Sequence, residues 1–169
     1  MRISIKTKEE RKLLYKCGII LVVLVGLDQL TKYLIVANPS LIRKPLVVIP
    51  NLFNIVSVRN TGAAWGMFHG NNVILFFIAF IAFLVLIIFF RSITERCPER
   101  YIALTLVLSG IIGNSIDRLF RKSVVDFLDF YFGSYHWPAF NVADSAICIG
   151  VCLLVLSFLL RKPLQNKQD

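Results

Sequence analysis

Apolar residues occur in four long runs along the chain, and each run is close to the length of a membrane-spanning helix. A bilayer core of about 30 Å requires about 20 residues of α-helix. The ranges that meet this requirement are 17–36, 73–90, 101–119 and 139–160. The pattern therefore predicts an all-α membrane protein with four transmembrane helices.

The first apolar run follows a basic stretch, which is also how a secretory signal peptide begins. The run continues past Asp28 and Lys32 without a small-residue cleavage site of the usual form. We therefore interpret it as an uncleaved membrane anchor.

The long connection between the first two runs has the pattern of a small β-element. Residues 46–49 are aliphatic, Pro50 and Asn51 break the run, and residues 54–59 are β-branched and roughly alternating. We expect an extracytoplasmic β-element at about 46–60, within an outer-loop segment. The stretch from Asn60 to Gly66 holds two glycines and several small residues, which is typical of a tight turn. Because there is no internal repeat or flexible linker, we expect one integral domain over 1–169.

Composition supports a membrane protein and argues against nucleic-acid binding. Hydrophobic residues make up 57% of the chain and charged residues 17%, with a mean hydropathy of +0.72. A soluble domain has about 45–50% apolar residues. The net charge of +9 comes from basic residues that flank the apolar runs and do not form a stripe on a polar domain.

The distribution of Lys and Arg predicts the orientation. Short cytoplasmic segments are enriched in these residues. They concentrate before the first run, between the second and third runs, and after the fourth run. Both termini are therefore expected in the cytoplasm, and the 38–72 loop outside it.

The metal-ligating residue types lack the spacing of a metal site. Cys17, Cys97, Cys148 and Cys152 are not arranged with His69 or His136 as zinc ligands are. They are typical of small packed residues and reduced thiols, and the sequence predicts no metal and no cofactor.

Polar residues interrupt the apolar runs at one end of the predicted helices. Ionisable groups inside a membrane are costly and usually face a cavity or a partner, so each marks a candidate site. The first and third helices run outward and the fourth inward, which brings all of these residues to the outer side. They are Asp28, Gln29, Thr31, Lys32, Asn114, Asp117, Arg118, Asn141 and Asp144, joined by the loop residues Asn60, Asp126 and Asp129. The sequence therefore predicts one polar site at the outer membrane interface.

The inner halves of the helices are apolar, whereas a transporter needs polar groups near the midplane. This pattern favours a site that receives its substrate laterally from the bilayer.

Several of these polar pairs also have a purely structural interpretation. Asp28 and Lys32 stand at i, i+4 and can neutralise one another or contact a substrate. Asn114 and Arg118 have the same spacing and can join helices or position a ligand. Asp117 is better explained as a structural partner.

Asp144 is the hardest to explain as structure alone. It is the only charged residue in 139–160, so its compensation must come from another segment. A second carboxylate from 126–129 can supply a shared proton, so that one carboxylate activates water while the other donates to a carbonyl oxygen. No Gly-x-Ser-x-Gly motif offers a nucleophilic serine. The residues thus predict a membrane aspartic hydrolase and leave Asp126 and Asp129 both open as the partner.

At these positions the sequence resembles the lipoprotein signal peptidase (signal peptidase II) family. Any one block would be a weak signal, but five in the right order on four predicted helices are highly specific. The matching blocks are Asp28-Gln-Leu-Thr-Lys32, Asn60-Thr-Gly-Ala-Ala-Trp65, Gly110-Ile-Ile-Gly-Asn114-Ser-Ile-Asp-Arg118, Val124-Val-Asp126-Phe and Pro138-Ala-Phe-Asn141-Val-Ala-Asp144-Ser. The family commonly has a glycine two or three residues before the Val-Val-Asp block, where this chain reads Arg121-Lys-Ser.

The resemblance implies which residues form the site. It places the two catalytic aspartates at Asp126 and Asp144, and so selects Asp126 over Asp129. The residues that it implies bind substrate or support the site are Asp28, Lys32, Asn60, Gly62, Asn114, Arg118, Asn141 and Ala143.

The resemblance also implies the reaction and its setting. The family's substrate is a diacylglyceryl-modified prolipoprotein, cut just before the lipidated cysteine by a monomer without a cofactor. The expected location is the bacterial inner membrane, in contact with lipid, with the active site on the extracytoplasmic side. The alternative is a non-catalytic lipoprotein-binding membrane protein, which would tolerate loss of the two carboxylates.

Overall fold

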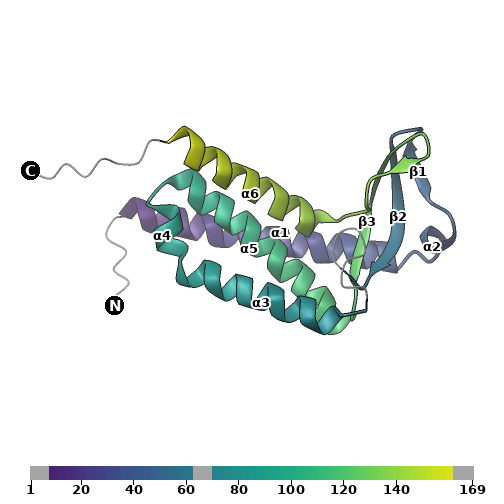
Figure 1. The fold of residues 1–169 in the computed structure, drawn as a ribbon, viewed down its shortest axis with the longest axis horizontal. Coiled ribbons are helices and arrows are strands. Elements are labelled where there is room, and N and C mark those ends of the chain that lie inside the picture. Colours follow the sequence, from purple (N-terminus) through teal and green to yellow (C-terminus); the bar gives the residue numbers. More distant parts are fainter. Residues whose placement is uncertain (1–7, 63–69, 162–169) are drawn as a thin grey trace, which may run out of the picture.

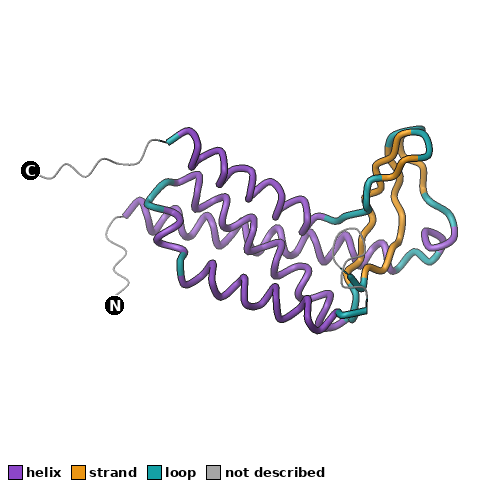
Figure 2. The backbone as a smooth tube through the Cα atoms, in the orientation of Figure 1, coloured by secondary structure: helices purple, strands orange, loops and turns teal. Residues whose placement is uncertain are grey.

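Long helices run side by side and carry a small sheet at one end (Figures 1 and 2). The computed structural model describes residues 8–62 and 70–161. Its long helices are α1 (Lys8–Val36), α3 (Asn72–Ile88), α5 (Pro98–Phe120) and α6 (Val142–Leu160), and its short helices are α2 (Ser40–Arg43) and α4 (Phe90–Thr94). The ends of α1 and α6 nearest the chain termini lie together, far from the sheet.

Within the described residues, three helices, α1, α5 and α6, are long and apolar enough to cross a membrane, whereas α3 is a shorter apolar helix of 17 residues. The helices carry large exposed apolar side chains, such as Val22 on α1, Ile81 on α3 and Leu159 on α6. None of the residues of α3 is buried. Apolar faces of this kind suit a lipid environment, and the four-span count stays a prediction.

Three helices start at other residues than the membrane spans expected from the sequence. The first helix already includes Lys8, the first residue described, so it extends well beyond the expected span of 17–36, and Glu9 and Glu10 are favourable near the positive end of its dipole. The third begins at Pro98 and not at 101, since proline is well suited to the first turn. The last begins at Val142 and not at 139, because Asn141 caps it.

The sheet is larger than the sequence indicated. The β-element expected at 46–60 is confirmed, but the all-α description misses two further strands and is wrong to that extent. The sheet is antiparallel with the order β1-β2-β3-β4, and its strands are β1 (Leu46–Ile49), β2 (Phe53–Asn60), β3 (Val124–Phe132) and β4 (Tyr135–His136). The pairing of β2 with β3 brings Asn60 opposite Val124, so the site-bearing ends of both strands meet.

Helices α5 and α6 approach closely through small residues. A Cβ atom added to Gly110 would collide with the carbonyl oxygen of Ala143 and with the Ile147 side chain. A Cβ on Gly150 would lie 2.6 Å from the Ala103 carbonyl oxygen. Small residues at such contacts are the usual means of close helix packing in membranes. The close approach at Gly110 holds the start of α6 against α5.

Lys122 lies in the turn between α5 and β3, within the stretch 121–123 that holds no glycine. Its φ is 58°, in the left-handed region that favours glycine. The turn therefore reaches this left-handed conformation with a lysine. A small buried core of Ile35, Leu41, Val125 and Phe127 packs the start of β3 against the end of α1.

Candidate active site

The predicted site residues come together where α1, α5 and α6 meet the sheet. Asn141 is fully buried and contacts both candidate carboxylates. Its side-chain amide donates to Asp126 Oδ1 at 2.7 Å, and its backbone N–H donates to Asp144 Oδ2 at 3.2 Å. Its own Oδ1 accepts from the Asp144 backbone N–H at 3.0 Å, which completes a reciprocal cap at the start of α6. One residue thus joins the strand carboxylate to the helix carboxylate.

Each carboxylate also accepts a hydrogen bond from another asparagine. Asn60 Nδ2 donates to Asp126 Oδ2 at 2.9 Å, and Asn114 Nδ2 donates to Asp144 Oδ1 at 2.7 Å. Burial raises the pKa of the Asp126 carboxyl to about 6, and the charge of Asp144 acts in the same direction. Two neighbouring carboxyls of this kind can hold one proton between them and can therefore serve as acid and base.

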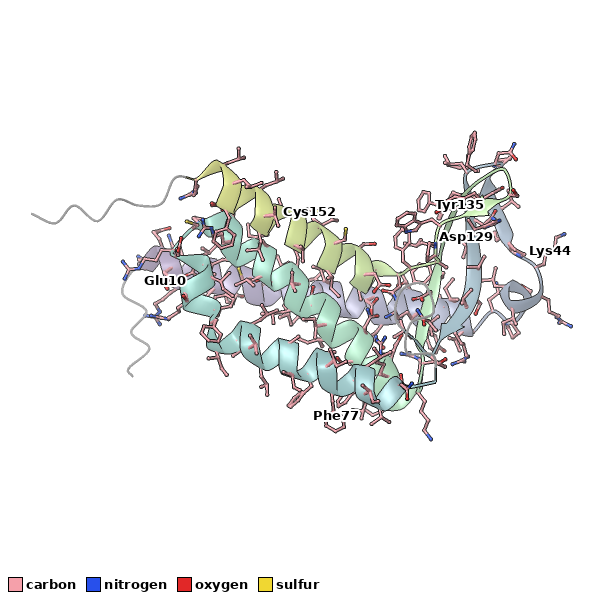
Figure 3. All side chains as sticks on the ribbon, viewed as in Figure 1. Glu10, Lys44, Phe77, Asp129, Tyr135 and Cys152 are labelled. Atoms are coloured by element: carbon pink, nitrogen blue, oxygen red, sulfur yellow. The ribbon has the colours of Figure 1, made fainter. Side chains whose placement is uncertain are left out.

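Asp129 lies on the other side of the strand from Asp126. Successive strand side chains alternate between the two faces, so residues three apart point in opposite directions. Asp129 Oδ2 accepts from Asn54 Nδ2 at 3.1 Å, and its Oδ1 is 2.9 Å from His136 Nδ1. Figure 3 shows Asp129 on the sheet. Its partners are therefore residues of the sheet.

A buried ion cluster lies next to the two carboxylates. Lys32 Nζ is 3.0 Å from Asp28 Oδ2 and 3.1 Å from Asp117 Oδ2, and it donates to Asn114 Oδ1 at 2.9 Å. All three charged side chains are buried. The pairing of Asp28 with Lys32 and the structural role of Asp117 are both confirmed. Because Asn114 bonds both Lys32 and Asp144, the cluster is connected directly to the site.

The two acids of this cluster hold backbone groups next to the candidate carboxylates. Asp28 Oδ1 accepts from the Ala143 backbone N–H at 3.0 Å, one residue before Asp144. Asp117 Oδ2 accepts from the Val125 backbone N–H at 3.0 Å, one residue before Asp126. Ala143 is 2% exposed and acts through its backbone. The cluster therefore positions Asp144 and Asp126 through the backbone of the residues that precede them.

Arg121 was not among the predicted polar residues, and Gln29 was among them without an assigned role. Arg121 donates to Gln29 Oε1 at 2.8 Å and also pairs with Asp117. Gln29 donates to Asp28 Oδ2 at 3.1 Å and to the Gly113 carbonyl at 3.1 Å. The i, i+4 spacing of Asp117 and Arg121 was the available signal in the sequence.

Arg118 holds the end of strand β2 beside the site. Its Nη2 donates to the Gly62 carbonyl oxygen at 3.1 Å, and the Gly62 N–H donates to Asn60 Oδ1 at 2.9 Å. The guanidinium charge acts on both Asp144 and Asp126. Its buried Nε has no hydrogen-bond partner within the described part of the chain. The rest of the predicted tight turn, 63–66, lies outside the described residues.

Comparison with known proteins identifies the family of this chain. The family model described as signal peptidase (SPase) II matches residues 20–160. The chain belongs to the signal peptidase II family. A protein named lipoprotein signal peptidase from Bacillus pumilus (strain SAFR-032) is 44% identical over 142 residues, which is 84% of this chain and 91% of the relative.

Solved structures share the fold of this signal peptidase II member. One bacterial membrane enzyme, solved by the in meso method at 2.3 Å, superimposes with a TM-score of 0.80 at 36% identity, covering 91% of this chain and 93% of that one. A second, solved by the same method at 1.9 Å, gives a TM-score of 0.77 at 38% identity, covering 87% and 94%. The family is one of aspartic peptidases, so the non-catalytic alternative is not favoured.

Proposed function

We propose that the chain removes signal peptides from diacylglyceryl-modified prolipoproteins, cutting just before the lipidated cysteine, with Asp126 and Asp144 as the catalytic dyad. Family membership supports the processing of prolipoproteins. The observation that carries the assignment of the dyad is the pair of bonds from Asn141, at 2.7 Å to Asp126 and 3.2 Å to Asp144.

The dyad acts on the scissile bond with one shared proton. The ionised carboxylate takes a proton from water, and the water oxygen attacks the scissile carbonyl carbon while the protonated carboxyl donates to the carbonyl oxygen. The tetrahedral intermediate then collapses: one hydroxyl returns its proton to the dyad as the C=O bond re-forms, and the C–N bond breaks. The leaving nitrogen gains the proton that water lost, which frees the amino group of the cysteine. Because the carboxyls titrate as a unit, the two roles belong to the pair.

The surrounding residues hold this pair and the substrate. Asn60, Asn114 and Asn141 keep the carboxylate oxygens in place through neutral amide donors. Arg118 and Gly62 flank the dyad and bind the substrate backbone. The positive guanidinium stabilises the negative charge that develops on the carbonyl oxygen. Asp28, Lys32 and Ala143 support the dyad from within the protein.

The membrane setting follows from the helices and the charge pattern. At 1.5 Å per residue, the 17 residues of α3 span about 26 Å, close to the thickness of a thin bilayer. We include α3 as the fourth span, which puts both termini in the cytoplasm and the sheet outside the inner membrane. The protein works there as one domain and one monomer, in contact with lipid that holds the scissile bond at the interface.

The decisive experiment is cleavage of lipidated prolipoprotein by purified protein in detergent. We expect Asp126→Asn and Asp144→Asn each to lower turnover by about 10²- to 10⁴-fold while substrate binding remains. Asp129→Asn is the matched control and keeps its turnover, because its partners are in the sheet. An unmodified substrate stays uncut. Near-normal turnover by either dyad variant would remove that aspartate from the mechanism.

A further inference from the structure

A polar cavity lies at the end of the helix bundle opposite the candidate active site. It has a volume of about 450 Å³ and lies between the first turns of α1 and the turn that joins α4 to α5. Figure 3 shows Glu10 at this end and Asp129 at the other. The polar residues that line the cavity are Glu9, Glu10, Lys12, Lys16, Arg96 and Tyr101.

The protein itself satisfies both carboxylates of the cavity. Glu9 forms an ion pair with Lys12 at 3.0 Å. Glu10 accepts a hydrogen bond from the Tyr101 hydroxyl at 2.9 Å and lies 3.9 Å from Arg91. Neither acid is therefore left to neutralise the remaining cations.

Lys16 and Arg96 are those remaining cations. Neither makes an ion pair or a side-chain hydrogen bond with any residue that the structure describes. Two uncompensated positive charges in one cavity attract an anion that both can reach.

The turn that presents Arg96 is held in place from both sides. Glu95 is paired with Arg100, and the Cys97 backbone N–H donates to the Thr94 carbonyl at 2.7 Å. Arg100 in turn donates to Ser157 Oγ at 2.9 Å and is 3.9 Å from the centre of the Phe158 ring. Arg96 therefore extends from a fixed backbone, which lowers the entropy cost of binding a ligand.

We propose that this cavity binds the headgroup of an anionic phospholipid, with the phosphate between Lys16 and Arg96. Basic pockets at the ends of membrane helices are suited to such headgroups. Immediately beyond Lys16, α1 exposes an apolar surface with Ile19 at 47% and Val23 at 58%, along which acyl chains can lie. Free phosphate has the same anionic chemistry but would leave that surface unused. The site is separate from the peptidase chemistry and does not depend on it.

Native mass spectrometry of the detergent-purified protein tests the proposal with phosphatidylglycerol and phosphatidylcholine as probes. We expect tighter binding of phosphatidylglycerol. Neutralising one interfacial cation weakens binding by about fivefold, so Lys16→Gln with Arg96→Gln weakens it by about twenty-five-fold. The control is Arg43→Gln with Lys44→Gln, which removes the same charge from two exposed residues at and just after the end of α2 and leaves binding unchanged. Lys44 lies at the far end of the molecule from the cavity (Figure 3).

Further variants and probes make each outcome decisive. Lys16→Arg with Arg96→Lys retains both charges and is expected to retain binding, which separates loss of charge from misfolding. Equal losses in the cavity and control variants would overturn the proposal, as would equal affinity for the two lipids. Displacement of phosphatidylglycerol by millimolar inorganic phosphate would identify free phosphate, and not lipid, as the ligand.

Discussion

Asn141 combines two tasks at the scale of a single residue. Its backbone and side chain begin α6 through the reciprocal cap with Asp144, and its amide holds Asp126 on the neighbouring strand. Asparagine suits both tasks, because its side chain offers an acceptor to the helix and a donor to the carboxylate. The helix start and the geometry of the proposed dyad therefore depend on the same side chain.

Substitutions of Asn141 can separate these two tasks. Asn141→Ala is expected to lose about 1 kcal/mol of stability with the cap, and much of the activity with the amide donor. Asn141→Ser keeps a capping oxygen but has no group that reaches Asp126. We therefore expect it to recover the melting temperature in detergent without recovering kcat. If the serine variant regained full turnover, the amide would have no part in positioning Asp126.

Asp126 makes the stability of the protein depend on pH. Its pKa rises from 3.8 to about 6 on folding, so the folded state binds the proton more tightly than the unfolded state. Stability therefore falls as pH rises from about 4 to 6, and it stays lower above pH 6. The Asp126→Asn variant has no carboxyl to titrate at this position, so its stability does not show this decrease. The hydrogen bonds that the substitution alters change the stability of the variant by the same amount at every pH.

Melting temperatures of Asp126→Asn and the unmodified protein at pH 4 and pH 7.5 test this dependence. We expect the difference between them to shift in favour of the variant at the higher pH. The same difference at both pH values would contradict the raised pKa.

At the scale of elements, the buried cluster around Lys32 holds α1 against α5. One lysine serves two carboxylates, and Arg121 provides a second cation at Asp117. The acids in turn hold the backbone N–H groups of Ala143 on α6 and Val125 on β3. Four elements are thus positioned by one set of charges.

Removal of the Lys32 charge is expected to destabilise the protein strongly. Lys32→Met removes the cation that pairs with Asp28, while Arg121 still pairs with Asp117. Loss of one partner from a buried pair costs about 3–5 kcal/mol. Lys44→Met is the matched control, since Lys44 is exposed and such surface changes stay within about 0.5 kcal/mol. Chemical unfolding in detergent measures both variants. Equal stabilities would show that the lysine charge contributes nothing net to the fold.

At the scale of the whole molecule, the proposed orientation places the sheet outside the cell membrane and the α4 turn inside. Lys44 and Ser92 are exposed and lie on opposite sides in that arrangement. A membrane-impermeant maleimide applied to intact cells or spheroplasts should label Lys44→Cys and leave Ser92→Cys unlabelled until the membrane is opened. The unmodified protein, with its four cysteines, provides the blank. The reverse labelling pattern would show that the sheet lies on the cytoplasmic side and the α4 turn outside.

The arrangement of the sheet shows where sequence reasoning stopped. The alternating pattern of 54–59 was sufficient to predict a strand, because side-chain alternation is a local property. Strand β3 was not predicted, although it pairs with β2 over most of its length. Its partner is more than sixty residues away in the chain, and pairing across such a distance leaves no periodic signal in either segment.

The polar residues of the site were predictable because the membrane makes them rare. Each polar group within an apolar run was conspicuous, and helix direction alone assigned Asp28, Asn114 and Asp144 to one end. The ion pair of Asp28 with Lys32 followed from the i, i+4 spacing on one helix. Local periodicity and the cost of burying charge therefore determined the helices and the location of the site.

The contacts between segments were decided only by the tertiary structure. The spacing of Asp126 and Asp129 could not show which acid lies with Asp144, and only the family resemblance selected Asp126. The physical reason appears in the structure, since the choice depends on the face that β3 presents to Asn141. Gln29 and Arg121 likewise acquired their roles through contacts between α1 and α5. Such contacts depend on the packing and register of elements that are far apart in the chain. The residues next to a side chain in the sequence do not determine which distant residue it will contact.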